Sequence, residues 1–201
     1  MKYRRLSVGL IRLIASLPLA HVATAQSIPA ASQRLQLSAF LAGTGTFTDL
    51  EGGKNLAITA GGDLTFLGLR HLAPAVELRG TYPIDSGHIS SQKNFLVGPK
   101  VGYDLDRFHP YVDFFVGRGA INYLNGGFVA GPLQYLSSNT FVYSPGVGVD
   151  YDLSHHFAVK FDVQFQHWNT PVLPSGSISP TALTLGGVYN FDFNSRRHWF
   201  N

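Results

Sequence analysis

The chain has 201 residues and a formal net charge of +3, and only 13% of its residues are charged. Soluble globular domains usually contain about 25% charged residues, so this chain is unusually poor in charge for that class. It contains no cysteine, which excludes a disulfide framework and a thiolate metal site.

The first 25 residues have the features of a secretory signal peptide. Basic Lys2, Arg4 and Arg5 precede an apolar stretch that ends in Ala-Thr-Ala, a small-residue pattern typical of a cleavage site. We therefore expect residues 1–25 to be removed on export and residues 26–34 to form a short N-terminal linker. The apolar stretch is too short to span a bilayer comfortably as a helix.

This leader also accounts for the positive charge of the chain. It holds 4 of the 15 basic residues, so the mature chain keeps 11 basic residues against 12 acidic ones, a net charge of about −1. We expect no nucleic-acid partner, because such binding relies on a basic surface. No later apolar run approaches the ~20 residues of a transmembrane helix.

Eight segments after the leader alternate between apolar and polar residues, which is the period-two pattern of β-strands. Each is long enough for a tilted membrane strand of about 9–11 residues. The segments are 35–47, 55–67, 73–83, 94–104, 109–123, 140–152, 157–168 and 181–193. The sequence therefore predicts an all-β domain over residues 35–193, followed by a C-terminal tail at 194–201.

Two of these segments contain a proline. Pro99 lies in the fourth segment and Pro145 in the sixth. Proline cannot donate a hydrogen bond to a neighbouring strand. We therefore expect a local bulge or an interrupted ladder at each position.

The connections between the segments alternate in length. GLRHL, DLDRF and DLSHH are tight turns. The intervening connections are longer and rich in Gly, Ser, Asn and Pro, around residues 48–55, 84–93, 124–139 and 169–180. Short turns at one end and long loops at the other are typical of outer-membrane barrels.

The stretch FAVKFDVQFQHW at 157–168 raises the question of which strand face meets water. Its phenylalanines would form the core of a soluble sandwich, but would contact lipid in an outer-membrane barrel. The interior of an eight-stranded barrel is just wide enough to be filled by side chains. The small and polar parity suits that interior better, as shown by Ser38, Ala42, Thr44, Thr59, Ala75, Gly98, Gly146, Gly148, Thr184 and Gly186. We therefore predict that the apolar parity faces lipid.

These features, with HPYVDFFVGRGAINY, PGVGVDYDL and TALTLGGVYNFDF, resemble the small OmpA/OmpX-type outer-membrane β-barrels, an eight-stranded meander family. The resemblance covers about 160 residues and is one of pattern. It implies an eight-stranded antiparallel up-and-down transmembrane β-barrel in the bacterial outer membrane, with both termini periplasmic. In that family the last strand ends in an aromatic residue that the barrel-assembly machinery reads, which here points to Phe193.

The inward parity carries nine charged residues. They are Asp63, Glu77, Arg79, Lys100, Asp113, Asp150, Lys160, Asp162 and Asp192. With the register set by the tight turns, the expected opposing pairs are Asp63 with Glu77, Lys100 with Asp113, and Asp150 with Lys160. An unpaired buried charge costs several kcal/mol, so we expect a salt-bridge network that plugs the barrel. A narrow ion or water pathway is the alternative.

His167 and Trp168 lie near the long-loop end of the seventh segment, where we expect an interfacial pair. Outer-membrane lipid A deacylases resemble this arrangement, with a lipid-facing histidine, a serine two residues later and an acid nearby. Here Asn169 stands at the position of that serine, and acyl transfer with histidine as base requires a hydroxyl. We therefore expect no enzymatic activity.

Neither a metal site nor a cofactor site is predicted. His155 and His156 are adjacent in a tight turn, but neighbouring side chains project apart on an extended chain and no third ligand is apparent. No glycine-rich segment stands between a strand and a helix, as a nucleotide site requires.

The sequence thus predicts a small outer-membrane barrel with a structural or surface-interaction role. The expected partners are outer-membrane lipids, the barrel-assembly machinery and an extracellular ligand bound through the long loops. The alternatives are a lipid A-modifying enzyme, a narrow channel and a soluble periplasmic lipocalin-like binder.

Overall fold

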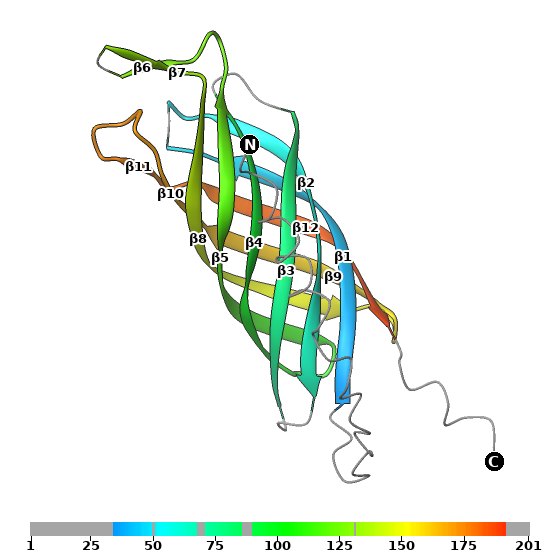
Figure 1. Cartoon of the computed structure of the whole chain (residues 1–201). Coiled ribbons are helices and arrows are strands. Elements are labelled where there is room, and N and C mark those ends of the chain that lie inside the picture. Colours follow the sequence, from blue (N-terminus) through cyan, green and yellow to red (C-terminus); the bar gives the residue numbers. More distant parts are fainter. Residues whose placement is uncertain (1–33, 50, 68–70, 86–89, 131, 192–201) are drawn as a thin grey trace, which may run out of the picture. The chain divides into compact units, whose positions relative to one another are not determined.

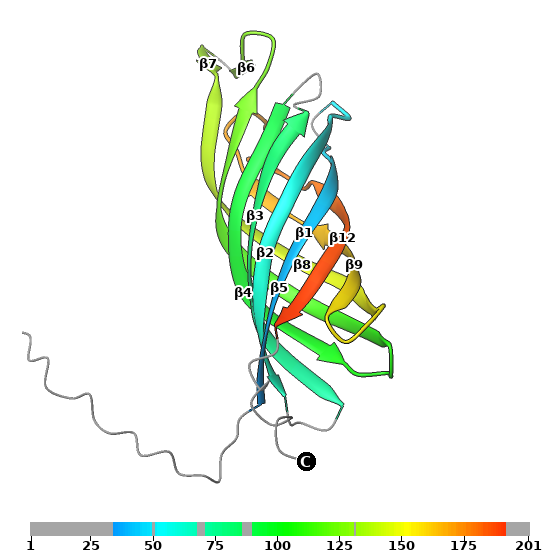
Figure 2. The same cartoon turned by 90° about the vertical axis from the view of Figure 1, so that its right-hand side faces the viewer.

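The computed structural model describes residues 34–49, 51–67, 71–85, 90–130 and 132–191. In this part of the chain, antiparallel strands close into a barrel (Figure 1, Figure 2). The wall consists of β1 (Arg34–Phe47), β2 (Lys54–Leu67), β3 (Leu72–Asp85), β4 (Ser90–Tyr103), β5 (Phe108–Tyr123), β8 (Ser137–Asp152), β9 (Phe157–Phe165), β10 (His167–Asn169) and β12 (Thr181–Phe191). No helix in these residues is long and apolar enough to cross a membrane.

The barrel closes through pairing of its first and last strands. β1 pairs with β12 from Leu37 opposite Phe191 to Phe47 opposite Thr181. β12 then pairs with β9, and β8 pairs with both β9 and β10. With β9 and β10 occupying one position in the wall, eight strands follow one another in chain order, as predicted.

The strand positions are confirmed to within a few residues. One difference is that the seventh predicted strand is divided into β9 and β10 at Gln166. Three short strands inside the long loops were not predicted. β6 (Phe128–Ala130) and β7 (Leu133–Tyr135) pair as a separate ribbon, and β11 (Ser177–Ile178) pairs with β10.

Both strand prolines interrupt their ladders without changing the register, which confirms one of the two predicted outcomes. The gap between β4 and β5 covers Gly98 and Pro99, and the gap between β8 and the β9/β10 strand covers Ser144 and Pro145. The missing proline N–H accounts for each gap. A shift of register occurs elsewhere, between β2 and β3 after Leu56.

The two parities of the strands separate as predicted. Phe157, Phe161 and Phe165 are 56%, 45% and 53% exposed, whereas Lys160 and Asp162 between them are completely buried. Each of the eight strands of the wall exposes large apolar side chains, for example Leu41, Ile58, Leu78, Val97, Val112, Val147, Phe161 and Leu185. Most of the charged side chains of the strands therefore lie inside the barrel, and its outer surface is apolar.

The two ends of the barrel differ. The short-turn end carries the turns at 104–107 and 153–156, together with the start of β1 and the end of β12. The long-loop end carries the connections at 124–136 and 170–180. In Figure 1 the β6–β7 ribbon lies at the end of the barrel opposite to the short turns.

Several predictions concern residues outside the described ranges. They are the signal peptide at 1–25, most of the linker at 26–34, interior Asp192, terminal Phe193 and the tail at 194–201.

Candidate functional site

Eight of the nine predicted interior charges lie together in the barrel lumen. They are Asp63, Glu77, Arg79, Lys100, Asp113, Asp150, Lys160 and Asp162. The three expected opposing pairs, Asp63 with Glu77, Lys100 with Asp113, and Asp150 with Lys160, are confirmed in the strand register. The closest ion pairs nevertheless join other partners. Arg79 pairs with Glu77 two residues away on β3, and the next closest pairs, Lys100 with Asp150 and Arg79 with Asp162, form across the lumen.

Glu77 is the centre of the ion-pair network. Arg79 donates to its Oε1 from both Nε, at 2.8 Å, and Nη2. Lys160 Nζ lies 3.2 Å from Glu77 Oε2, and Lys100 Nζ lies 3.7 Å from the same oxygen. One fully buried carboxylate therefore contacts three cations that come from β3, β4 and β9.

Asp162 and Tyr111 extend this network across the barrel. Arg79 Nη2 donates to Asp162 Oδ2 at 3.0 Å, and the Tyr111 hydroxyl donates to the same oxygen at 3.4 Å. The Tyr111 hydroxyl in turn accepts a hydrogen bond of 3.2 Å from Lys160 Nζ. Arg79 also lies over the ring of Phe115, 4.4 Å from its centroid, in a cation–π contact. The polar network and the apolar part of the lumen therefore meet at Arg79.

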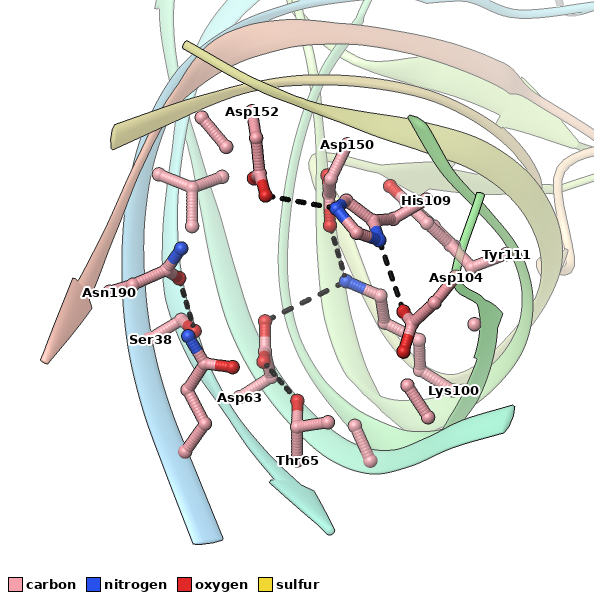
Figure 3. Close-up of a pocket in the computed structure, with 16 residues that line it drawn as sticks. Ser38, Asp63, Thr65, Lys100, Asp104, His109, Tyr111, Asp150, Asp152 and Asn190 are labelled. Atoms are coloured by element: carbon pink, nitrogen blue, oxygen red, sulfur yellow. Dashed lines mark hydrogen bonds and ion pairs between the residues drawn. The ribbon is translucent and has the colours of Figure 1, made fainter. Parts of the chain in front are cut away.

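A polar cavity of about 200 Å³ lies at the short-turn end of the lumen (Figure 3). Lys100 points into it between two carboxylates, with Nζ 2.8 Å from Asp150 Oδ2 and 3.7 Å from Asp63 Oδ2. Thr65 donates to Asp63 at 3.1 Å. Water can therefore reach the edge of the network, while Glu77 remains completely buried behind it.

Asp113 is held by hydrogen bonds from a neutral side chain. Gln164 Nε2 donates to both of its oxygens, at 2.9 and 3.1 Å, and Ser144 Oγ donates to Gln164 Oε1 at 2.7 Å. Among the described residues, Asp113 has no ion pair within 4.0 Å. This carboxylate is thus solvated by amide and hydroxyl groups in place of water.

Threonine hydroxyls form a second polar chain along the inner wall. Thr184 bonds to Thr44 at 3.1 Å, Thr44 to Thr59 at 2.6 Å, and Thr59 to Thr81 at 2.9 Å. This chain connects β12, β1, β2 and β3, and so crosses the seam where the barrel closes.

Trp168 lies inside the barrel, so its predicted interfacial position is wrong. Its side chain is completely buried, and its Nε1 donates to Gln166 Oε1 at 2.9 Å. It belongs to an apolar cluster near the long-loop end, formed by Leu96, Phe115, Ile121, Tyr123, Val142, Trp168, Val172 and Ile178. Gly119 makes room for the indole, because a Cβ at that position would overlap its ring. Trp168 lies two residues after the buried Gln166 and therefore on the same inward face of the strand, where the indole fills the space beside Gly119.

His167 lies on the opposite parity and is partly exposed. Its ring stacks on Tyr143, with the centroids 4.7 Å apart. Asn169 is exposed, while the next hydroxyl along the chain, that of Thr170, is buried and bonds to Tyr123 OH at 2.6 Å. The hydroxyl nearest in sequence is therefore already engaged inside the lumen.

Among the described residues, no three or more His, Cys, Asp or Glu side chains are arranged as a metal site.

The polar network in the lumen also includes Tyr111 and Gln164, which sequence reasoning did not single out. Both share the inward parity of charged neighbours, Asp113 and Asp162 respectively, so strand periodicity was the signal that could have found them.

His109 joins two short turns at the rim of the cavity (Figure 3). Its Nδ1 lies 3.0 Å from Asp104 Oδ1 and its Nε2 lies 3.0 Å from Asp152 Oδ2. Because both aspartates are more than a third exposed, we expect His109→Ala to lower the free energy of unfolding by less than about 1 kcal/mol. Hydrogen exchange should become faster in the turns at 104–107 and 153–156 only. A loss of several kcal/mol in urea unfolding would contradict this assignment.

No protein-family model matches the sequence, and no curated protein matches it. Solved structures with a similar course of the chain include Neisserial surface protein A (14% identity, 78% of this chain and 97% of that chain covered, TM-score 0.49). They also include Ail of Yersinia pestis with a heparin analogue (12% identity, 78% of this chain and 97% of that chain covered, TM-score 0.49). A third is the outer membrane enzyme PagL (18% identity, 77% of this chain and 99% of that chain covered, TM-score 0.48). At these identities and TM-scores, none of them supplies a functional residue or an activity for this chain.

The assignment of the fold depends on the chain's own geometry. The strands follow one another in chain order, β1 closes on β12, the charges lie inside and the large apolar side chains outside. The described part of the chain is an eight-stranded antiparallel up-and-down β-barrel with a charge-filled lumen.

Proposed function

We propose that this protein is a bacterial outer-membrane barrel that acts as a rigid support for surface-exposed loops. The observation that carries the proposal is the apolar outer wall, to which each of the eight strands contributes exposed Leu, Ile, Val or Phe side chains. A soluble protein rarely exposes more than a few hundred Å² of continuous apolar surface. Lipid removes this cost, because the wall is then in an apolar medium.

The difference between the two ends supports an orientation. Short turns usually face the periplasm in such barrels and long loops the outside. The described start of β1 and end of β12 lie at the short-turn end, which agrees with periplasmic termini. The loops at 124–136 and 170–180 would then face the medium.

The β6–β7 ribbon supports a role in surface interaction. Val129, Leu133 and Leu136 are 68%, 57% and 65% exposed in this loop. They differ from the wall residues because they lie beyond the ends of the long strands, where lipid does not cover them. Exposed apolar groups on a loop are typical of contacts with another molecule.

The lumen supports a non-conducting and non-enzymatic barrel. Buried ion pairs fill its middle and the apolar cluster fills its long-loop side, which does not favour a water file. The amide of Asn169 provides no nucleophile for an acyl transfer assisted by His167. Lipid A incubated with the refolded protein is expected to remain unmodified, and loss of an acyl chain would overturn this part of the proposal.

The location is tested by expressing the full chain and separating the envelope fractions. We expect the protein in the outer membrane, with faster gel migration before boiling than after it, because a closed barrel resists detergent until heated. A tag between Ser175 and Gly176 should be accessible on intact cells. A tag between Asp106 and Arg107 should become accessible only after permeabilisation.

Recovery as a soluble periplasmic protein would overturn the membrane assignment and favour the lipocalin-like alternative. Outer-membrane recovery with the tag at Asp106 exposed on intact cells would overturn the orientation alone.

A further inference from the structure

A groove of about 720 Å³ lies on the outer wall. It crosses β3, β4, β5 and β8, which are neighbours in the wall (Figure 1). Its sides include Tyr82 from β3, Lys93 and Phe95 from β4, Arg118 from β5 and Asn139 from β8. Tyr82 and Phe95 are 67% and 57% exposed, so the aromatic edges of the groove face outward. The groove is separate from the lumen and from the rim at His109.

Small residues produce the hollow. Gly80 lies opposite Phe95 in the register, and Ala120 lies opposite Lys93. A Cβ placed on Gly80 would only touch the Phe95 ring, at 3.8 Å, so the absence of a larger side chain at this position leaves the floor beside that ring low. The groove is therefore a gap in an otherwise continuous layer of large apolar side chains.

Two cations border this gap. The side chains of Lys93 and Arg118 are exposed, and neither side chain makes an ion pair or a hydrogen bond with a residue in the described ranges. In contrast, the lumen cations Arg79, Lys100 and Lys160 all lie within 4.0 Å of a carboxylate. Phe95 lies opposite Arg118 and two residues from Lys93, so the cations are diagonal neighbours with backbones about 7–8 Å apart.

The height of the two cations on the wall is informative. The outward residues of β4 are apolar or aromatic from Phe95 to Tyr103, and the next outward residue is Lys93. From Tyr103 to Lys93 the strand is roughly 33 Å long at about 3.3 Å per residue, which is about 25 Å in height at the usual strand tilt of about 35–45°. The lipid-facing band of an outer-membrane barrel is about 25 Å tall. Lys93 and Arg118 therefore lie where that band ends on the long-loop side, at the depth of lipid headgroups.

We propose that this groove binds an acyl lipid of the surrounding leaflet whose headgroup is an anionic phosphate monoester. The headgroup phosphate accepts hydrogen bonds from Lys93 and Arg118, since guanidinium and ammonium groups are the usual partners of phosphate. The first methylenes of an acyl chain lie over Gly80 and Ala120, beside Tyr82 and Phe95. The apolar floor favours a lipid over a free phosphate ion, because the ion would leave that surface uncovered.

This inference rests on the proposed membrane location, so folding is scored first by the gel shift on heating. The refolded full chain in detergent micelles is then offered phosphatidic acid or phosphatidylcholine with identical acyl chains, and native mass spectrometry measures the bound lipid. We expect phosphatidic acid to bind at least about tenfold more tightly. The Lys93→Gln/Arg118→Gln double variant should lose this preference and fold normally, because both side chains are exposed.

Lys54→Gln is the matched control, because Lys54 also lies at the long-loop end but over Phe47 and outside the groove. It should keep the preference within about twofold. Gly80→Leu should weaken the binding of both lipids by filling the floor.

The inference is overturned if the double variant keeps the preference, or if Lys54→Gln loses it equally, which would indicate general surface charge. It is also overturned if millimolar inorganic phosphate displaces the lipid, which would indicate an ion site. A chain that remains soluble without detergent would overturn the proposed function itself, and the membrane site with it.

Discussion

Replacing Glu77 with glutamine is expected to lower the free energy of unfolding by about 3–5 kcal/mol, which is the cost of removing one partner from a buried ion pair. The substitution keeps the size of the side chain, so its effect is electrostatic. Arg79 and Lys160 each lose a carboxylate within hydrogen-bonding distance, and both are almost completely removed from water.

A count of charges alone would predict the opposite result. The described lumen holds five carboxylates, those of Asp63, Glu77, Asp113, Asp150 and Asp162, against three cations, Arg79, Lys100 and Lys160. Removing one acid would therefore reduce an excess of negative charge. Distance decides between the two effects, because Glu77 contacts all three cations within 4.0 Å. Coulomb interactions over such distances are strong in a buried site.

The measurement is urea unfolding of the protein in phosphatidylcholine vesicles, with a shift of the midpoint and an unchanged slope. Asp104→Asn is the matched control, since it removes a carboxylate that is 41% exposed and should cost less than about 1 kcal/mol. In the double variant Glu77→Gln/Lys160→Met, the loss should be smaller than the sum of the single losses by about 1–3 kcal/mol. Additive losses, or an effect of Glu77→Gln no larger than the control, would show that Glu77 is not the centre of the network.

Replacing Trp168 with alanine is expected to lower the free energy of unfolding by about 3–5 kcal/mol. The indole is completely buried among Phe115, Ile121 and Val142, and the missing side chain of Gly119 leaves room for it. The rigid wall of a closed barrel cannot collapse into the space left behind, so the full cost of the cavity should be observed.

Trp168→Phe separates packing from hydrogen bonding. It keeps an aromatic ring in the cluster but leaves Gln166 Oε1 without its donor, so we expect an intermediate loss of about 1–3 kcal/mol. Asn169→Ala, at the exposed neighbouring position, should have almost no effect. Equal stability of Trp168→Ala and the original protein would contradict the buried position of the indole.

The strand pattern alone was sufficient to predict most of the wall. Side chains on a strand alternate between two faces whatever surrounds them, so the period of two in FAVKFDVQFQHW already separates Phe161 from Lys160 and Asp162. Turn length is also a local property, and it distinguished the two ends of the barrel. The register followed from these tight turns, which is why Asp63 opposite Glu77 was predicted correctly.

The ion pairs that cross the lumen could not be predicted from neighbours along the chain or from strand register. Lys160 bonds to Glu77, which is 83 residues away and on a strand that is not its neighbour in the wall. The inward position of Trp168 likewise depends on the space left by Gly119 on β5. The sequence by itself therefore determined the number of strands, their faces and the two ends, because these depend on neighbours along the chain. Only the tertiary structure decided which charges meet and which aromatic ring fills the lumen, because closure of the barrel sets the distances between non-neighbouring strands.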